Sequence, residues 1–246
     1  MISFLDTFNQ RKKEIDDFLE LMKFLEQKQF QRDNDEETRF DKFFHNEADG
    51  ISLTYQEMIN IFKSNISLML YNIIEFTVTN LMESIYDEIT MNQLAYKDVN
   101  ECIRTLWKKT ILKTANDPNA NFNTFLKKND LIINQIIHNT TLELHAKKVL
   151  PAGNLDGQNI VETFEAHGIS VKTNSRNFRP DILSNIKNQR NDLAHGSVSF
   201  VDADRGDTLQ DIEKHKGFVI NFLHELIENV EEYINQAKYR NVDSIT

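Results

Sequence analysis

Apolar side chains recur at intervals of three and four residues along most of the chain, the spacing that places them on one face of an α-helix. In residues 1–30 this seam consists of Phe4, Phe8, Ile15, Phe18, Met22 and Leu25. It predicts an amphipathic N-terminal arm that needs a partner surface, either the rest of the chain or a second subunit. Residues 31–50 are rich in charge and hold no sustained period, so we expect a loop that ends at Gly50.

The longest periodic stretch covers about residues 54–90, where the apolar face is wider than a surface helix requires. We expect a central, largely buried helix there, with at most one break. Further helices are predicted at 97–113 and 122–148, separated by the turn-forming residues TANDPNAN.

The C-terminal half predicts three more helices with recognisable ends. In residues 151–169, Asp156 is a candidate N-cap and Gly168 a candidate stop. The stretch RPDILSNIKNQRNDLAHG has apolar residues at helical spacing and closes on Gly196. The last helix is expected over about 208–239, and the pattern as a whole predicts an all-α protein.

Composition supports this class, because 246 residues contain only 7 Gly and 3 Pro. We expect a helical arm and charged loop over 1–50, a helical domain over 51–240 and a tail over 241–246. The formal net charge of -10 repels polyanions, so any contact with nucleic acid requires a local basic patch.

The chain shows no sign of export or of a membrane span. Its N-terminus lacks an apolar core long enough for a signal peptide, and the most apolar stretch, 66–76, is far shorter than a bilayer requires. The single cysteine, Cys102, excludes an internal disulfide and a cysteine-based zinc site. These features predict a cytoplasmic location with no membrane partner.

Candidate chemistry gathers near the end of the helix that closes on Gly196. Arg190 and His195 are five residues apart, about 140° of rotation on an ideal helix, and Asn191 lies between them in angle. Arginine offers a planar fork that matches a phosphate, and histidine exchanges a proton near neutral pH. RNA already carries its nucleophile, the 2′-hydroxyl, so these two groups suffice for cleavage with no metal or cofactor.

The alternative is a purely structural helix end, in which Arg190 pairs with a helix carboxylate and His195 caps the last carbonyls. The surroundings favour chemistry, because small residues follow His195 and leave room for a substrate. The segment from Lys172 to Arg190 is also basic, because its five cations and the single carboxylate of Asp181 give a net local charge of +4. Its cations are Lys172, Arg176, Arg179, Lys187 and Arg190. This is a candidate RNA-binding footprint.

A second candidate site is weaker. His138 and His145 are seven residues apart, but no third ligand lies near them in the sequence, so surface or capping roles are expected and no metal site is predicted.

The stretch RNDLAH, Arg190 to His195, resembles the R-x4-H signature of HEPN domains, the higher-eukaryote and prokaryote nucleotide-binding superfamily. Two more segments are similar to a prokaryotic subfamily that places this motif near its C-terminus. Residues 67–89 resemble the long first core helix, and AGNLDGQNIVETFEAHGI resembles the Gly-Asn-x-Asp segment with the helix after it. The resemblance covers roughly residues 52–238, and the N-terminal arm matches less well.

The resemblance implies a bundle of four or five core helices that commonly dimerises and brings two motifs into one cleft. Many such domains are metal-independent endoribonucleases that act as toxins or in phage defence. By this resemblance Arg190 holds the scissile phosphate and His195 is the general base or acid. Asn191 orients the substrate or its neighbours, and Glu75 faces the motif from the core helix with Arg190 as its partner.

Three hypotheses follow. The first is a ribonuclease dimer that leaves 2′,3′-cyclic phosphate ends, with RNA, a second copy and an antitoxin or defence protein as partners. The second is a catalytically silent module that binds nucleotide, RNA or a partner protein. The third is a structural protein with an accidental motif. Ser197 stands where some paired HEPN toxins carry a tyrosine for adenylylation, so control by that modification is not expected.

Overall fold

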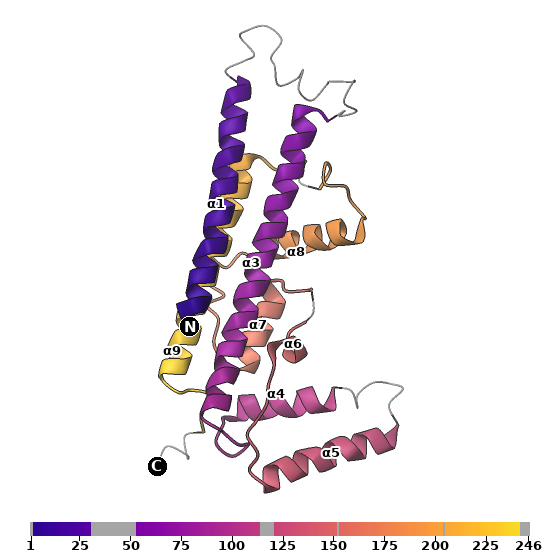
Figure 1. Ribbon diagram of the computed structural model, residues 1–246, viewed down its shortest axis with the longest axis vertical. Coiled ribbons are helices and arrows are strands. Elements are labelled where there is room, and N and C mark those ends of the chain that lie inside the picture. The colour runs from indigo at the N-terminus through magenta and orange to yellow at the C-terminus, as the bar shows by residue number, and fades with distance from the viewer. Residues whose placement is uncertain (1, 31–52, 114–120, 152, 204, 242–246) are drawn as a thin grey trace. The chain divides into compact units, whose positions relative to one another are not determined.

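In the computed structural model, residues 2–30, 53–113, 121–151, 153–203 and 205–241 are described, and their regular structure is helical, with no extended strand among them (Figure 1). The predicted all-α class is confirmed. The helices are α1 (Ile2–Phe30), α3 (Tyr55–Met91), α4 (Glu101–Leu112), α5 (Phe122–Ile137), α6 (Ala146–Val149), α7 (Gly157–Ala166), α8 (Pro180–His195) and α9 (Leu209–Asn235). The loop expected at 31–50, most of the TANDPNAN turn and all but the first residue of the 241–246 tail lie outside the described residues.

The chain forms two compact units. The first contains Met1–Glu75 and Arg179–Asn221, and the second contains Phe76–Phe178 and Phe222–Thr246. Two long helices, α3 and α9, contribute residues to both units.

In the first unit the N-terminal arm packs on its own chain. Of the predicted α1 seam, Phe8, Ile15 and Met22 are buried, and the neighbouring Leu19 is buried with them. The Phe18 ring meets the Phe62 ring of α3 edge-on, with centroids 5.5 Å apart. Lys23 and Asp16 of α1 form ion pairs with Glu213 and Lys216 of α9, respectively. Of the two surfaces left open by the sequence, the rest of the chain is therefore the one that covers α1.

The central helix α3 runs unbroken for 37 residues. It begins with a capping box, because the backbone N–H of Thr54 donates to Glu57 Oε2 at 2.7 Å and the N–H of Glu57 donates to Thr54 Oγ1 at 3.2 Å. Thr208 and Asp211 make the same reciprocal pair at the start of α9. None of the helices described is both long and apolar enough to span a bilayer.

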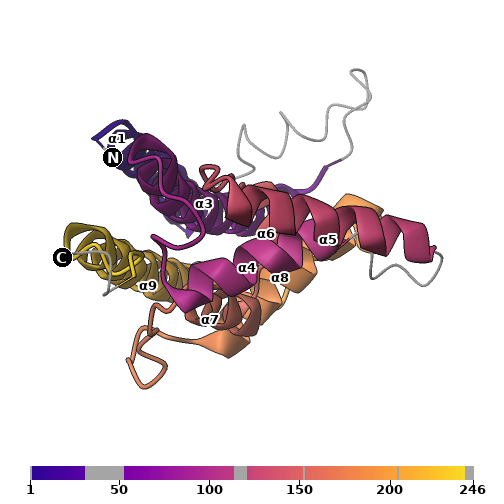
Figure 2. The same ribbon diagram turned by 90° about the horizontal axis from the view of Figure 1, so that it is seen from below.

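Two predicted helices are shorter than expected. Instead of one helix over 122–148, α5 ends at Ile137 and α6 begins at Ala146. Asn139 between them adopts a positive φ of 49°, and the Leu142 N–H donates to the Leu94 carbonyl at 2.9 Å, so the chain turns back toward the end of α3. Residues 97–100 precede α4 because the Asn100 side chain caps its start. The helices α4 and α5 lie side by side (Figures 1 and 2).

The second unit buries a polar network around His167, which lies directly after α7 and is fully buried. Its Nδ1 is 2.6 Å from the Thr163 carbonyl, which only accepts, so Nδ1 carries the proton. Nε2 then accepts from the Tyr86 hydroxyl at 2.6 Å. The Tyr233 hydroxyl donates to the His167 carbonyl at 2.7 Å. Both imidazole nitrogens are therefore satisfied in the neutral form.

This burial predicts a loss of stability in acid. Burial lowers the pKa of His167 to about 4, from an ordinary value of 6.5. Between these pH values the unfolded chain binds a proton that the folded chain does not. The contribution of His167 to the free energy of unfolding is therefore fully present above pH 6.5 and is lost as the pH falls toward 4. From pH 7 to pH 5 we expect His167 to account for a loss of about 2 kcal/mol.

The measurement is urea unfolding of the wild type and of His167→Gln at both pH values. The variant is less stable at pH 7 but should lose about 2 kcal/mol less than the wild type on acidification. An equal loss in both proteins would mean that another group causes the acid sensitivity.

Candidate functional site

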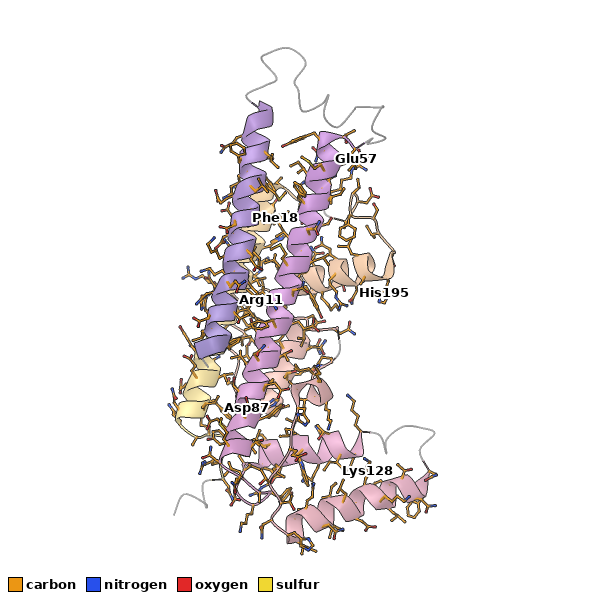
Figure 3. The ribbon with its side chains drawn as sticks, in the orientation of Figure 1. Arg11, Phe18, Glu57, Asp87, Lys128 and His195 are labelled. Atoms are coloured by element: carbon orange, nitrogen blue, oxygen red, sulfur yellow. The ribbon has the colours of Figure 1, made fainter. Side chains whose placement is uncertain are left out.

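The end of α8 is the site that the sequence singled out. The helix starts with Pro180 in its first turn and buries Ile182, Leu183, Ile186 and Leu193. On the remaining faces, Arg190 and Asn191 are half-buried and His195 is exposed. Figure 3 shows His195 at the end of the helix, where α8 gives way to the loop toward α9.

Backbone groups close α8 without help from the imidazole. Gly196 adopts a left-handed conformation with φ of 69°. Its N–H donates to the Leu193 carbonyl at 3.2 Å, and the Ser197 N–H donates to the Asp192 carbonyl at 2.9 Å, the two bonds of a Schellman motif. Within the described chain the His195 side chain makes no hydrogen bond. The geometry therefore does not support the alternative that His195 caps the last carbonyls.

Arg190 points in a different direction, toward α3. Its guanidinium carbon lies 5.0 Å from the centroid of the Tyr71 ring, which is fully buried. Its Nη1 donates to Asn191 Oδ1 at 3.0 Å. A guanidinium over an aromatic face is attracted by the ring quadrupole, so the cation is held without a carboxylate.

The expected ion pair between Arg190 and Glu75 is not among the ion pairs of the described residues. Glu75 is half-buried and lies one helical turn after Tyr71 on α3. The guanidinium of Arg190 rests on the Tyr71 ring instead. Whether Glu75 supports the site remains a prediction.

Two polar residues that the sequence analysis did not single out fix the chain after the motif. The Ser64 hydroxyl donates to the Phe200 carbonyl at 2.7 Å, and the Lys63 ammonium donates to the Asp207 carbonyl at 2.6 Å. Both side chains are buried on α3. The sequence could have indicated these two contacts, because Lys63 and Ser64 lie at positions of α3 that should face the core. Buried polar groups require hydrogen-bond partners.

The basic segment before the motif does not form one cluster within one unit. Lys172 and Arg176 are exposed residues of the second unit, and Arg179 and Lys187 belong to the first.

Arg179 is already engaged by its own chain. Its Nε and Nη2 donate to the Asp181 carboxylate at 3.0 and 2.6 Å, and its guanidinium stacks on Phe218. These hydrogen bonds hold the pKa of Asp181 below its usual range. Arg179 is therefore less available to a phosphate than its position in the sequence suggested.

The described residues contain no group of three or more His, Cys, Asp or Glu side chains that could hold a metal ion. His138 and His145 in particular lie on different sides of the turn between α5 and α6. At the end of α8 itself, the structure places a half-buried guanidinium and an exposed imidazole.

Comparison with family models matches residues 3–239 to the MAE_28990-like HEPN family. The matched region starts within α1, so it includes the arm that the motif-based resemblance had matched less well. Comparisons with curated proteins and with solved structures gave no match. Because the family model spans nearly the whole chain, this protein belongs to the MAE_28990-like HEPN family.

Proposed function

We propose that the protein is a metal-independent endoribonuclease of the HEPN type. The main support for this proposal is that the end of α8 presents an exposed imidazole and, separately, a guanidinium held in place. The Schellman motif occupies the last carbonyls and leaves His195 exposed, while Tyr71 holds the Arg190 guanidinium one and a half turns earlier. A cation for the phosphate and a titratable group for proton transfer are the minimum for cleaving RNA.

In the proposed reaction, His195 removes the proton from a 2′-hydroxyl as its oxygen attacks the neighbouring phosphorus. The bond from phosphorus to the 5′-oxygen breaks, and that oxygen takes up a proton. The products are a 2′,3′-cyclic phosphate and a 5′-hydroxyl end. Arg190 binds the non-bridging oxygens and stabilises the charge that develops on them. Asn191, which accepts a hydrogen bond from Arg190, fixes the direction of the fork.

The proposed setting follows from the family. The enzyme acts in the cytoplasm as a toxin or a phage-defence effector, and an antitoxin or sensor protein restrains it. Two copies bring their motifs into one cleft, so the second His195 can serve as the acid for the leaving oxygen.

A second candidate is a silent module that binds nucleotide, RNA or a partner protein. The observation in its favour is that the Arg190 guanidinium rests on Tyr71 of its own chain.

Cleavage in the absence of metal separates the two candidates. We expect the purified wild type to cut total RNA in EDTA and to leave 2′,3′-cyclic phosphate ends. His195→Ala and Arg190→Ala should each lower the rate by at least about a hundredfold, because proton transfer or charge stabilisation is lost. His145→Ala, which removes an exposed histidine outside the motif, is the matched control and should cut at the wild-type rate. RNA binding without cleavage by all four folded proteins would favour the silent module.

The ring under Arg190 should matter for the rate rather than for RNA affinity. In Tyr71→Leu the guanidinium loses its aromatic support, which is worth about 1 kcal/mol or more at a buried site, so kcat should fall about tenfold. Tyr71→Phe keeps the ring and should stay near the wild-type kcat. Single-turnover cleavage at saturating RNA makes this comparison, and equal rates for the two variants would argue against a positioning role.

Salt dependence of RNA binding tests the basic footprint. In a His195→Ala background, each phosphate contact with single-stranded RNA contributes about 0.7 to the slope of log affinity against log salt concentration. Arg176→Ala should reduce the slope by about this amount. Arg179→Ala should reduce it by less, because Asp181 already binds that guanidinium. Fluorescence anisotropy at four salt concentrations measures both slopes, and a larger change for Arg179→Ala would contradict this ranking.

A further inference from the structure

The helix α5 exposes a continuous apolar face. Six of its large apolar side chains are between 36% and 70% exposed. They are Phe122, Phe125, Leu126, Ile133, Ile136 and Ile137. Ile132 is the one buried residue of this helix. The helix α5 runs along α4 (Figure 2). No described part of the chain covers this face.

The six side chains form one stripe. At about 100° per residue they fall within a sector of about 120°, the width of a helix face that packs against another helix. We call these six residues the α5 stripe. Asn129 is the only polar residue inside the sector, at the middle of the helix. Leu131 is also exposed, but it lies on the opposite side of α5.

We propose that the α5 stripe docks on the α5 stripe of a second copy of this chain, with the two helices antiparallel. The spacing of the stripe is close to symmetric about Asn129, as a two-fold contact between identical helices requires. In that register Phe122 of one copy lies opposite Ile136 of the other, and Phe125 lies opposite Ile133. Asn129 meets Asn129, and a lone polar residue in an apolar helix seam fixes its register.

The exposed area is sufficient for such a contact. At roughly 200 Å² for a fully exposed large apolar side chain, the stripe presents roughly 600 Å². Two copies together would bury about 1,200 Å², the lower end of the range for specific protein interfaces. An apolar patch of this size on a protein surface commonly marks an interaction site.

Charge also favours a second copy over a membrane surface. The chain carries a net charge of -10, but α5 holds only Lys127, Lys128 and Asp130 as charged residues, so two copies that meet at α5 bring few charges together. A helix that lies on a bilayer normally has a strongly basic polar face. The sides of α5 outside the stripe are instead largely uncharged, with Asn123, Thr124, Asn134 and Gln135.

This proposal shares with the ribonuclease proposal only the expectation of a second copy, and it rests on packing at α5 instead of on the chemistry of Arg190 and His195. The cleavage variants leave α5 unchanged, and the variants below leave Arg190 and His195 unchanged. Failure of one proposal can therefore be told apart from failure of the other.

The first test is sedimentation equilibrium of the full chain. We expect self-association in the wild type and a dissociation constant at least tenfold higher in Ile133→Asp. Leu131→Asp, the same change at a similarly exposed position outside the stripe, should associate like the wild type. A monomeric wild type at about 100 μM, or equal effects of the two variants, would overturn the proposal. So would a monomer that sediments with vesicles containing one-third phosphatidylserine.

The second test reads the register directly, because Cys102 is the only cysteine of the chain. In a Cys102→Ala background, Asn129→Cys should form a covalent dimer under mild oxidation, and Leu131→Cys should form at least tenfold less. An associating protein in which Asn129→Cys does not cross-link would show that copies meet through another surface. Circular dichroism of each variant confirms that helix content is retained.

Discussion

The apolar surface of α3 is the constraint on which the rest of the structure depends. A helix that is apolar on most of its sides must be covered on most of its sides. In the first unit its partners include α1, through Phe18 and Phe62, and α8, through Arg190 over Tyr71. In the second unit Tyr86 of the same helix binds the His167 network. Tyrosine side chains along α3 thus make specific polar contacts with the elements that cover this helix.

The geometry of the candidate site follows from how one of these covering helices, α8, ends. Because α8 buries Leu193 and stops at Gly196, the last turn is fixed by both packing and backbone hydrogen bonds. Arg190 lies on the side of α8 that faces α3, and His195 lies at its exposed end. A cation on a buried ring keeps its position, while an exposed imidazole can exchange protons with solvent and substrate.

The apolar faces of two amphipathic helices, α1 and α5, differ in whether the described chain covers them. The α1 seam is covered within its own unit, with ion pairs to α9 at its edge. The α5 stripe has the same kind of pattern, yet it stays exposed in the described structure. The physical requirement is identical for both helices, since apolar surface is stabilised by removal from water. For α5 the described residues leave that requirement unmet, and the proposed second copy would meet it.

The helices and many of their ends could be predicted from the sequence, because they depend on interactions within a few residues. The period of three and four located α3 and α9, Asp156 marked the start of α7 by accepting from the Asn159 N–H, and Gly196 marked the end of α8. The motif also placed Arg190 and His195 near one helix end. Each of these features is encoded locally, by side-chain spacing, a cap or a left-handed residue.

The partner that each side chain meets became clear only from the three-dimensional packing. It placed Tyr71 against Arg190 and paired Arg179 with Asp181. It also turned the chain back after Ile137, where the sequence had predicted a continuing helix. Periodicity shows which face of a helix is apolar, but the surface that covers this face lies far away in the sequence. That choice depends on the packing of the whole unit, which no local pattern contains.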